Sequence, residues 1–270
     1  MLAGAALVAG LAVAQASHAT LLVSEAFHYA AGDLSGNGGG TGFGGAWSGG
    51  GGANKNQVLS TSIFEPSDPS ARSVQIASLF AVTTRSLAAT YVSGGATTYY
   101  VSFLFNANSF ESGNHFAGIG LAGPGATDSL FMGMPGGTGG LGFDWNARGT
   151  LTGPASSNTN YLVLVEIKAG VGSTTTVSMF ATTDLSMSGT ALMTTTPIGV
   201  LSNMANFSFD SVTIAGTYTP GSIQLGRFAI ADDANEAVAF SGISAVPGSG
   251  GAMLAMVAAS CVGGRRRRTA

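Results

Sequence analysis

The chain has 270 residues, of which only 9% are charged, and its formal net charge is −3. About 25% charged residues is usual for soluble domains, so this neutral, glycine-rich composition suits an extracellular β protein with many turns better than a cytosolic one. Residues 20–246 hold six basic and thirteen acidic residues, which excludes the basic patch that nucleic-acid binding requires. A single cysteine, Cys261, excludes an internal disulfide.

The N-terminus has the pattern of an export signal. Residues 2–14 are all Leu, Val, Ala or Gly, and the apolar run ends at Gln15. Ser17 and Ala19 are small residues at the spacing that signal peptidase requires, which places cleavage between Ala19 and Thr20, with Ala16 as a competing site. We therefore predict that residues 1–19 form a signal helix outside the fold and that the protein is exported.

Between its two ends the chain reads as a series of short strands separated by Gly, Asn, Pro and Ser. The clearest are residues 97–106 (TTYYVSFLFN) and 161–169 (YLVLVEIKA). In the first, Tyr99, Val101, Phe103 and Phe105 share one face, as Tyr161, Val163, Val165 and Ile167 do in the second. Further strands are predicted over 20–27, 74–80, 86–91, 115–122, 130–134, 175–182, 207–214, 223–231 and 237–241.

About eleven strands without intervening helices predict one all-β domain over residues 20–245. Its expected architecture is a two-sheet antiparallel β-sandwich. Two glycine-rich stretches are expected as loops, residues 35–52 and 133–142. Phe43 and Trp47 are the only large side chains of the first, and they are expected to pin it against the edge of the sandwich.

The opening of this domain, LLVSEAFHYAAGDLSGNGGGTGFGGAWSGG, carries a family resemblance. Its acidic-aromatic turn (Glu25, Phe27, Tyr29, Gly32, Leu34) and the following glycine-rich segment (Gly42, Gly45, Trp47) resemble the start of exported bacterial proteins with a concanavalin A-like, or LamG-like, jelly-roll domain. His28 stands where these proteins usually have an aspartate. Residues 222–231 (SIQLGRFAIA) resemble the final strand of such domains.

The C-terminal residues 246–270 resemble a PEP-CTERM sorting tail. Val246-Pro247 is followed by an apolar run and then by the cluster Arg265, Arg266, Arg267 and Arg268, with Gly248 where the name-giving glutamate would stand. The uncharged stretch 248–264 would form a helix of roughly 26 Å, just short of a bilayer core of about 30 Å. The resemblance implies a helix outside the fold that lies in the inner membrane before an exosortase processes the tail. The mature protein would then reside at the cell surface or in the extracellular matrix.

Catalytic patterns are missing from the sequence. Jelly-roll glucanases need two carboxylates that face one cleft from the same strand, and none of the five glutamates stands two residues before an aspartate on a predicted strand. No Gly-x-Ser-x-Gly elbow occurs either. We therefore predict no catalytic residue and no enzymatic activity. The alternatives are a divergent polysaccharide-acting glycoside hydrolase and a purely structural or protein-binding surface domain.

Two binding sites are candidates. Asp232, Asp233, Asn235 and Glu236 offer hard oxygen ligands for Ca²⁺, unless they form a simple solvated turn. Trp47, Trp145 and Asp144 could form a sugar site of exposed aromatic rings beside a carboxylate, unless the tryptophans are buried anchors. The leading interpretation is a non-catalytic surface module with affinity for a polysaccharide, whose other partners are the export and sorting enzymes.

Overall fold

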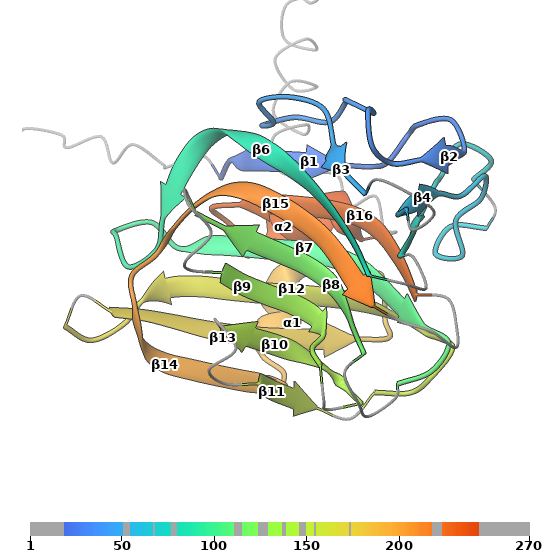
Figure 1. The fold of residues 1–270 in the computed structure, drawn as a ribbon. Coiled ribbons are helices and arrows are strands. Elements are labelled where there is room, and N and C mark those ends of the chain that lie inside the picture. Colours follow the sequence, from blue (N-terminus) through green and yellow to red (C-terminus); the bar gives the residue numbers. More distant parts are fainter. Residues whose placement is uncertain are drawn as a thin grey trace, which may run out of the picture.

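The computed structural model describes residues 19–50, 55–66, 68–76, 80–110, 115–123, 129–136, 139–145, 150–153, 155–172, 174–217 and 223–242. These residues form two antiparallel sheets packed face to face, with two short helices outside them (Figure 1). The predicted all-β sandwich is therefore confirmed.

The nine-stranded sheet has the order β14-β13-β12-β7-β16-β5-β4-β2, and β1 also pairs with β16. The strand β16 lies between β7 and β5, so the last strand of the domain closes the sheet against strands from its first half. The bounds are β1 Leu21–Glu25, β2 Gly32–Asp33, β4 Gln57–Val58, β5 Val74–Ile76, β7 Tyr99–Ala107, β12 Thr159–Ala169, β13 Thr174–Thr182, β14 Gly199–Ala205 and β16 Ile223–Ala231.

The seven-stranded sheet has the order β11-β10-β9-β8-β15-β6-β3 and faces the viewer in Figure 1. Four of its strands, β8, β9, β10 and β11, are consecutive in the chain, whereas β15 inserts between β8 and β6. The bounds are β3 Ser48–Gly49, β6 Ala81–Val92, β8 Phe116–Ala122, β9 Ser129–Met134, β10 Leu141–Trp145, β11 Thr150–Gly153 and β15 Ser208–Thr217.

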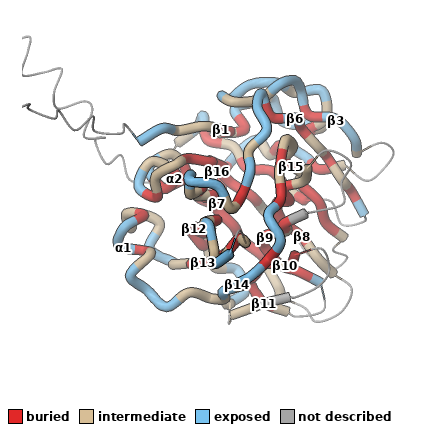
Figure 2. Tube along the Cα trace, turned by 90° about the vertical axis from the view of Figure 1, so that its left-hand side faces the viewer, coloured by how far each residue is buried: buried red, intermediate tan, exposed pale blue. Residues whose placement is uncertain are grey.

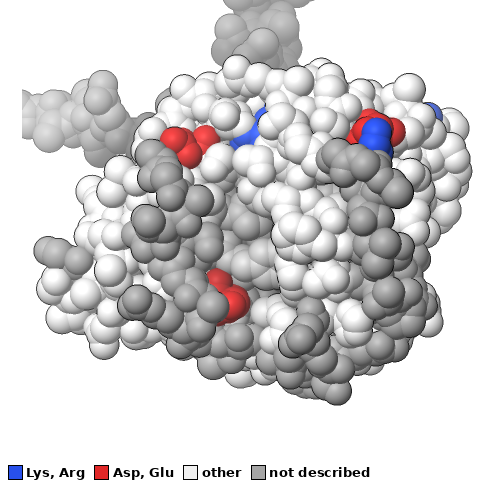
Figure 3. All heavy atoms as spheres, viewed as in Figure 1, with Lys and Arg blue, Asp and Glu red and all other residues white. Residues whose placement is uncertain are grey.

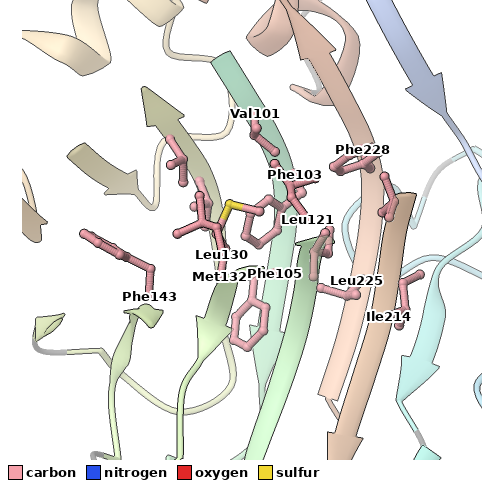
Figure 4. Close-up of a cluster of buried hydrophobic side chains, with 14 of the residues drawn as sticks. Val101, Phe103, Phe105, Leu121, Leu130, Met132, Phe143, Ile214, Leu225 and Phe228 are labelled. Atoms are coloured by element: carbon pink, nitrogen blue, oxygen red, sulfur yellow. The ribbon is translucent and has the colours of Figure 1, made fainter. Parts of the chain in front are cut away.

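The core lies between the two sheets (Figure 4). Val101, Phe103 and Phe105 of β7 meet side chains such as Leu121 of β8 and Met132 of β9, all of them fully buried. The predicted alternation along β7 and β12 is confirmed, because all eight residues assigned to one face belong to this core. In the seven-stranded sheet the same alternation means that the residues between two core positions of a strand point away from the core.

The outer face of the nine-stranded sheet is covered by α1 (Gly189–Met193) and α2 (Ala234–Ser241). In the side view of Figure 2 these helices lie on one side of the sandwich and β8–β10 on the other. Leu104, Leu162, Leu164 and Phe180 point away from the main core and form a second cluster with the helices. This cover leaves the seven-stranded sheet as the sheet whose described outer face has no helix over it.

The predicted strand 237–241 is wrong, because these residues belong to α2. The Asp233 side chain accepts hydrogen bonds from the backbone N–H groups of Asn235 and Glu236 and thereby caps the helix. The alternation of small and apolar residues in AVAFS resembles a strand, but four helical residues, Ala234, Ala237, Val238 and Ser241, are buried against the sheet. The sequence prediction also missed α1, the two-residue strands β2, β3 and β4, and the strands β10, β11 and β14.

Candidate functional site

The outward positions of the seven-stranded sheet line up in rows that run across the strands. One row joins Asp144 of β10, Phe131 of β9, Gly120 of β8, Thr213 of β15 and Thr84 of β6, each residue being the register partner of the next. Residues directly opposite in an antiparallel pair have Cβ atoms about 4.5–5.5 Å apart. The row therefore forms a continuous strip across the open face, acidic and aromatic at one end and hydroxyl-rich at the other.

Three phenylalanines form an aromatic ridge on this face, defined as Phe80, Phe116 and Phe131. The ring centroids of Phe80 and Phe116 are 6.3 Å apart, and those of Phe116 and Phe131 are 5.6 Å apart, both in edge-to-face geometry. Phe80 is 64% exposed, and the other two are partly exposed. Neighbouring exposed aromatic rings on a soluble protein mark an interaction site more often than isolated ones.

Glycines surround the ridge where other sheets would carry side chains. Gly118 and Gly133 face each other across β8 and β9, and Gly142 continues the same row on β10. A Cβ atom on Gly118 would lie 2.0 Å from the Met132 carbonyl oxygen, so the two strands approach too closely for any side chain here. The phenylalanine rings therefore lie beside backbone that carries no side chains.

Asp144 lies beside the ridge as the register partner of Phe131. Its Oδ1 atom is buried and has no hydrogen-bond partner. A buried carboxylate oxygen without a donor is costly, and in native structures such a group is unusual enough to require an explanation.

The other half of the face carries hydroxyl groups. The Oγ1 atoms of Thr84 and Thr213 are 3.2 Å apart, and the Ser211 hydroxyl donates to the Ala122 carbonyl oxygen at 3.0 Å. Figure 3, which views this face, shows few charged atoms among the described residues and an acidic group in a hollow near its middle. The described face thus combines aromatic, hydroxyl and carboxylate groups without a basic patch.

Trp47 and Trp145 are not part of this face, which corrects their prediction as ligand-binding residues. Trp47 is 2% exposed and its ring lies 6.2 Å from that of Phe27. Trp145 is 8% exposed and packs 4.4 Å from the ring of Phe207 in the core. Both are buried anchors, the alternative that the sequence left open, so neither offers a ring face to a ligand; of that predicted trio only Asp144 faces outward.

The glycine-rich loop is pinned to the sandwich by Trp47 and Phe43, as predicted, and also by a buried ion pair that the sequence did not predict. Arg85 of β6 donates to Glu25 of β1 at 2.6 Å, and the side chains of both are almost fully buried. Arg85 also donates to the carbonyl oxygens of Gly45 at 2.6 Å and Gly39 at 2.7 Å. Its guanidinium lies 3.9 Å from the centre of the Phe43 ring. One arginine therefore fastens the loop at three points.

The pattern Glu25-x-Phe27-x-Tyr29, part of the family resemblance, serves the same network. Glu25 accepts hydrogen bonds from the Phe27 backbone N–H at 2.8 Å and from the Tyr29 hydroxyl at 2.5 Å, and Trp47 Nε1 donates to it at 3.3 Å. Burial, and then the hydrogen bond and negative charge of Glu25, raise the pKa of Tyr29 well above its usual range. The residues that carried the family resemblance are thus structural.

The predicted calcium ligands belong to the start of α2. Asp233 caps the helix, Asp232 accepts a hydrogen bond from the Thr20 backbone N–H at 2.6 Å, and Asn235 Oδ1 accepts one from Thr190 N at 2.9 Å. No three His, Cys, Asp or Glu side chains of the described residues are placed to hold a metal ion. The structure gives these residues helix-capping and loop-tethering contacts, and calcium binding by Asp232, Asp233, Asn235 and Glu236 stays a prediction.

The predicted signal peptide and sorting tail lie almost entirely outside the residues that the structure describes. Ala19 and Thr20 are the first described residues, whereas Val246, Pro247 and Arg265–Arg268 lie outside the described residues. Within the described part of the chain, no helix is both long enough and apolar enough to cross a membrane.

Comparison with known proteins finds solved structures with a similar fold. No protein-family model and no curated protein matches the chain. The globular domain of T. cruzi calreticulin matches with a TM-score of 0.54 at 12% identity, over 89% of this chain and 100% of that chain. An alginate lyase mutant in complex with an alginate tetrasaccharide has a TM-score of 0.45 at 12% identity, over 77% of this chain and 95% of that chain. Basic winged bean lectin with Tn-antigen has a TM-score of 0.39 at 8% identity, over 59% and 86%. The fold is the concanavalin A-like jelly roll, and at these identities the likeness concerns the fold alone.

The aromatic ridge was missed by sequence reasoning. Phe116 and Phe131 lie within predicted strands, where large apolar residues are expected in the core. Their neighbours two positions along, Gly118 and Gly133, carried the available signal, because a strand face with glycine where a core residue should be is a poor core face. Register, which brings Asp144 beside Phe131, is a property of the folded sheet.

Proposed function

We propose that this domain is a non-catalytic carbohydrate-binding module and that its ligand lies on the outer face of the seven-stranded sheet. The observation that carries the proposal is the aromatic ridge beside the unpaired Oδ1 of Asp144. Sugar rings present an apolar C–H face and a rim of hydroxyl groups. Sites for such ligands combine aromatic side chains with a few well-placed polar groups.

The ridge supplies the apolar part of this site. Phe80, at 64% exposure, lies directly before β6, and the partly exposed Phe116 and Phe131 lie on β8 and β9. A sugar stacked on the ridge would cover apolar surface that is otherwise in contact with water. The hydroxyl groups of Thr84, Thr213 and Ser211 lie along the same face for polar contacts.

The absence of catalysis is part of the proposal. Glycoside hydrolysis by the usual mechanisms needs two carboxyl groups about 5–9.5 Å apart. The described strands of this sheet carry two carboxylates that are not in the core, Asp144 on β10 and Asp210 on β15. Two strands, β9 and β8, lie between them, which at about 4.8 Å per strand separates the two backbones by about 14 Å, beyond this range. The alternative, a divergent polysaccharide-acting enzyme, would be favoured by turnover that Asp144→Asn abolishes.

We further propose that the module is exported by its N-terminal signal and sorted through its C-terminal tail to the cell surface or the extracellular matrix. The apolar run before Ala19 and the order Val246-Pro247, apolar stretch and Arg265–Arg268 support this. Mass spectrometry of the native C-terminus tests it: an end near Val246 is expected, and an intact arginine cluster in the mature protein would contradict sorting by cleavage.

A glycan array with ridge variants tests the binding function. Phe116→Ala and Phe131→Ala are expected to weaken binding by at least tenfold, because each removes a stacking surface. Val171→Ala is the matched control, since Val171 is an 85% exposed apolar residue at the turn between β12 and β13 of the other sheet. Equal binding by all three variants and the wild type would refute a site on the ridge.

A further inference from the structure

We infer that the ligand of this face is an uncharged glycan and that Asp144 is the residue that selects it. The half-buried carboxylate of Asp144 accepts hydrogen bonds from sugar hydroxyl groups, and its charge disfavours glycans that carry carboxylate or sulfate groups. The inference rests on the proposed binding function and deepens it, since it names the chemical class of the ligand.

The first step is the unpaired acceptor. Asp144 Oδ1 is buried without a hydrogen-bond partner, and an ionised carboxylate accepts hydrogen bonds but donates none. Its register partner on β9 is Phe131, whose ring offers only C–H groups. A ligand stacked beside Phe131 must therefore bring O–H or N–H donors to Asp144, and sugar hydroxyl groups are such donors at the edge of a stacked ring.

The second step is the placement of the basic residues. Recognition of carboxylate- or sulfate-bearing glycans needs Arg or Lys in the site. The five described basic side chains are all engaged elsewhere, and the sixth basic residue of the domain, Arg148, lies outside the described residues. Lys55 pairs with Asp33, Arg227 with Glu65, and Lys168 with Glu166 on the nine-stranded sheet, Arg72 donates to the carbonyl oxygens of Pro69 and Ala71, and Arg85 points inward to Glu25.

The third step combines the two. An acidic glycan on the ridge would bring its negative charge close to Asp144, where no described basic side chain compensates it. Like charges in a partly buried site are strongly unfavourable, so a single carboxylate provides specificity by repulsion as well as by attraction. Uncharged glycans gain the hydrogen bond and avoid the repulsion.

The test compares wild type, Asp144→Ala and Asp144→Asn on two sets of probes. The uncharged set is soluble β-glucan, galactomannan and galactan, and the acidic set is polygalacturonate and dextran sulfate. Wild type is expected to bind a member of the uncharged set and to bind the acidic set at least tenfold more weakly. Asp144→Ala is expected to lose at least tenfold in affinity for the uncharged ligand, and Asp144→Asn to narrow the gap between the two sets. Asp68→Asn is the control. It removes one exposed negative charge from the loop between β4 and β5 of the nine-stranded sheet, so it should leave the affinity for both probe sets unchanged.

The melting temperature of Asp144→Ala separates a binding role of Asp144 from a structural one, because a structural role would lower it. Because Oδ1 has no partner in the free protein, Asp144→Ala should leave the melting temperature unchanged or raise it. A clear fall would show that the carboxylate stabilises the fold and would overturn the inference. So would a preference of the wild type for the acidic probes, or full affinity in Asp144→Ala.

The two proposals fail in different ways. Preference for acidic glycans with loss of binding in Phe131→Ala would leave the carbohydrate site in place and refute only the assignment to uncharged ligands. Binding of every probe that is unaffected by Phe131→Ala, or no binding to either set, would refute the site itself.

Discussion

Replacement of Arg85 by methionine is expected to destabilise the domain strongly. Methionine keeps the apolar stem of the side chain but removes the guanidinium that fastens the glycine-rich loop. Glu25, with 2% of its side chain exposed, then loses its cationic partner, and the carbonyl oxygens of Gly39 and Gly45 each lose a donor. Removal of one partner from a buried ion pair costs about 3–5 kcal/mol.

The lost backbone hydrogen bonds raise this cost, at about 1 kcal/mol or more for each carbonyl that water does not reach. We therefore expect a loss of at least about 4 kcal/mol in the free energy of unfolding, if the lower bound for the ion pair is taken with one such carbonyl. At about 2–4 °C per kcal/mol for a domain of this size, the melting temperature should fall by roughly 8–16 °C.

The assay is urea and thermal unfolding followed by far-UV circular dichroism and by tryptophan fluorescence, since Trp47 lies in the pinned loop. Lys55→Met is the matched control, because Lys55 forms an ion pair with Asp33 at 2.5 Å on the surface, with 40% and 32% of the side chains exposed. It should cost less than about 1 kcal/mol. The double variant Glu25→Gln/Arg85→Met should be more stable than the sum of the two single losses predicts. A cost for Arg85→Met no larger than that for Lys55→Met would refute the reasoning.

Three further predictions follow from single contacts. The raised pKa of Tyr29 means that its protonated form stabilises the fold. This contribution is complete below the ordinary tyrosine pKa of about 10 and is lost as the pH rises above it. Tyr29→Phe should therefore lose less free energy of unfolding than wild type between pH 9 and about 11 in urea titrations, and parallel stability–pH curves for the two proteins would contradict this. Gly118→Ala should cost at least about 3 kcal/mol because its Cβ would meet the Met132 carbonyl oxygen, whereas Gly120→Ala on the same strand, with its nearest contact at 3.7 Å, should cost under about 1 kcal/mol; equal costs would exclude the steric explanation. Cleavage between Ala19 and Thr20 would place a new α-ammonium group 2.6 Å from Asp232 Oδ1, so Asp232→Asn should destabilise a protein that starts at Thr20 by up to about 1 kcal/mol more than its N-acetylated form, and the same loss in both would refute an ion pair.

The strands with the cleanest alternation could be predicted because a buried face dictates every second residue. Tyr99–Ala107 and Thr159–Ala169 are such strands, and their core faces are those that the sequence predicts. β14 was missed because glycine and small polar residues dilute its pattern. β10 alternates cleanly, with Leu141, Phe143 and Trp145 in the core, but it is only five residues long and begins inside a glycine-rich stretch that was predicted as a loop. Likewise, α2 forms because its small residues pack on the nine-stranded sheet and Asp233 caps its first turn.

The candidate site was predicted only in part, for a related reason. Tryptophan is the usual first choice for a sugar platform, yet the size of Trp47 and Trp145 is used here to fill the interior. The less conspicuous Phe116 and Phe131 are exposed because the register places glycines, rather than a covering helix, beside them. Asp144 was predicted because it stands beside an aromatic residue in the sequence, but the absence of a hydrogen-bond partner for its Oδ1 depends on three-dimensional packing.

The most direct test of the central claim is an NMR titration of the amide signals with a soluble uncharged oligosaccharide that the array identifies. If the ligand lies on the seven-stranded sheet, the largest shift changes should occur at Gly120, Phe131 and Asp144, and they should disappear in Phe131→Ala. Changes concentrated instead at Lys168 and Val200 on the nine-stranded sheet, or at α1 and α2, would contradict the assignment of the binding face.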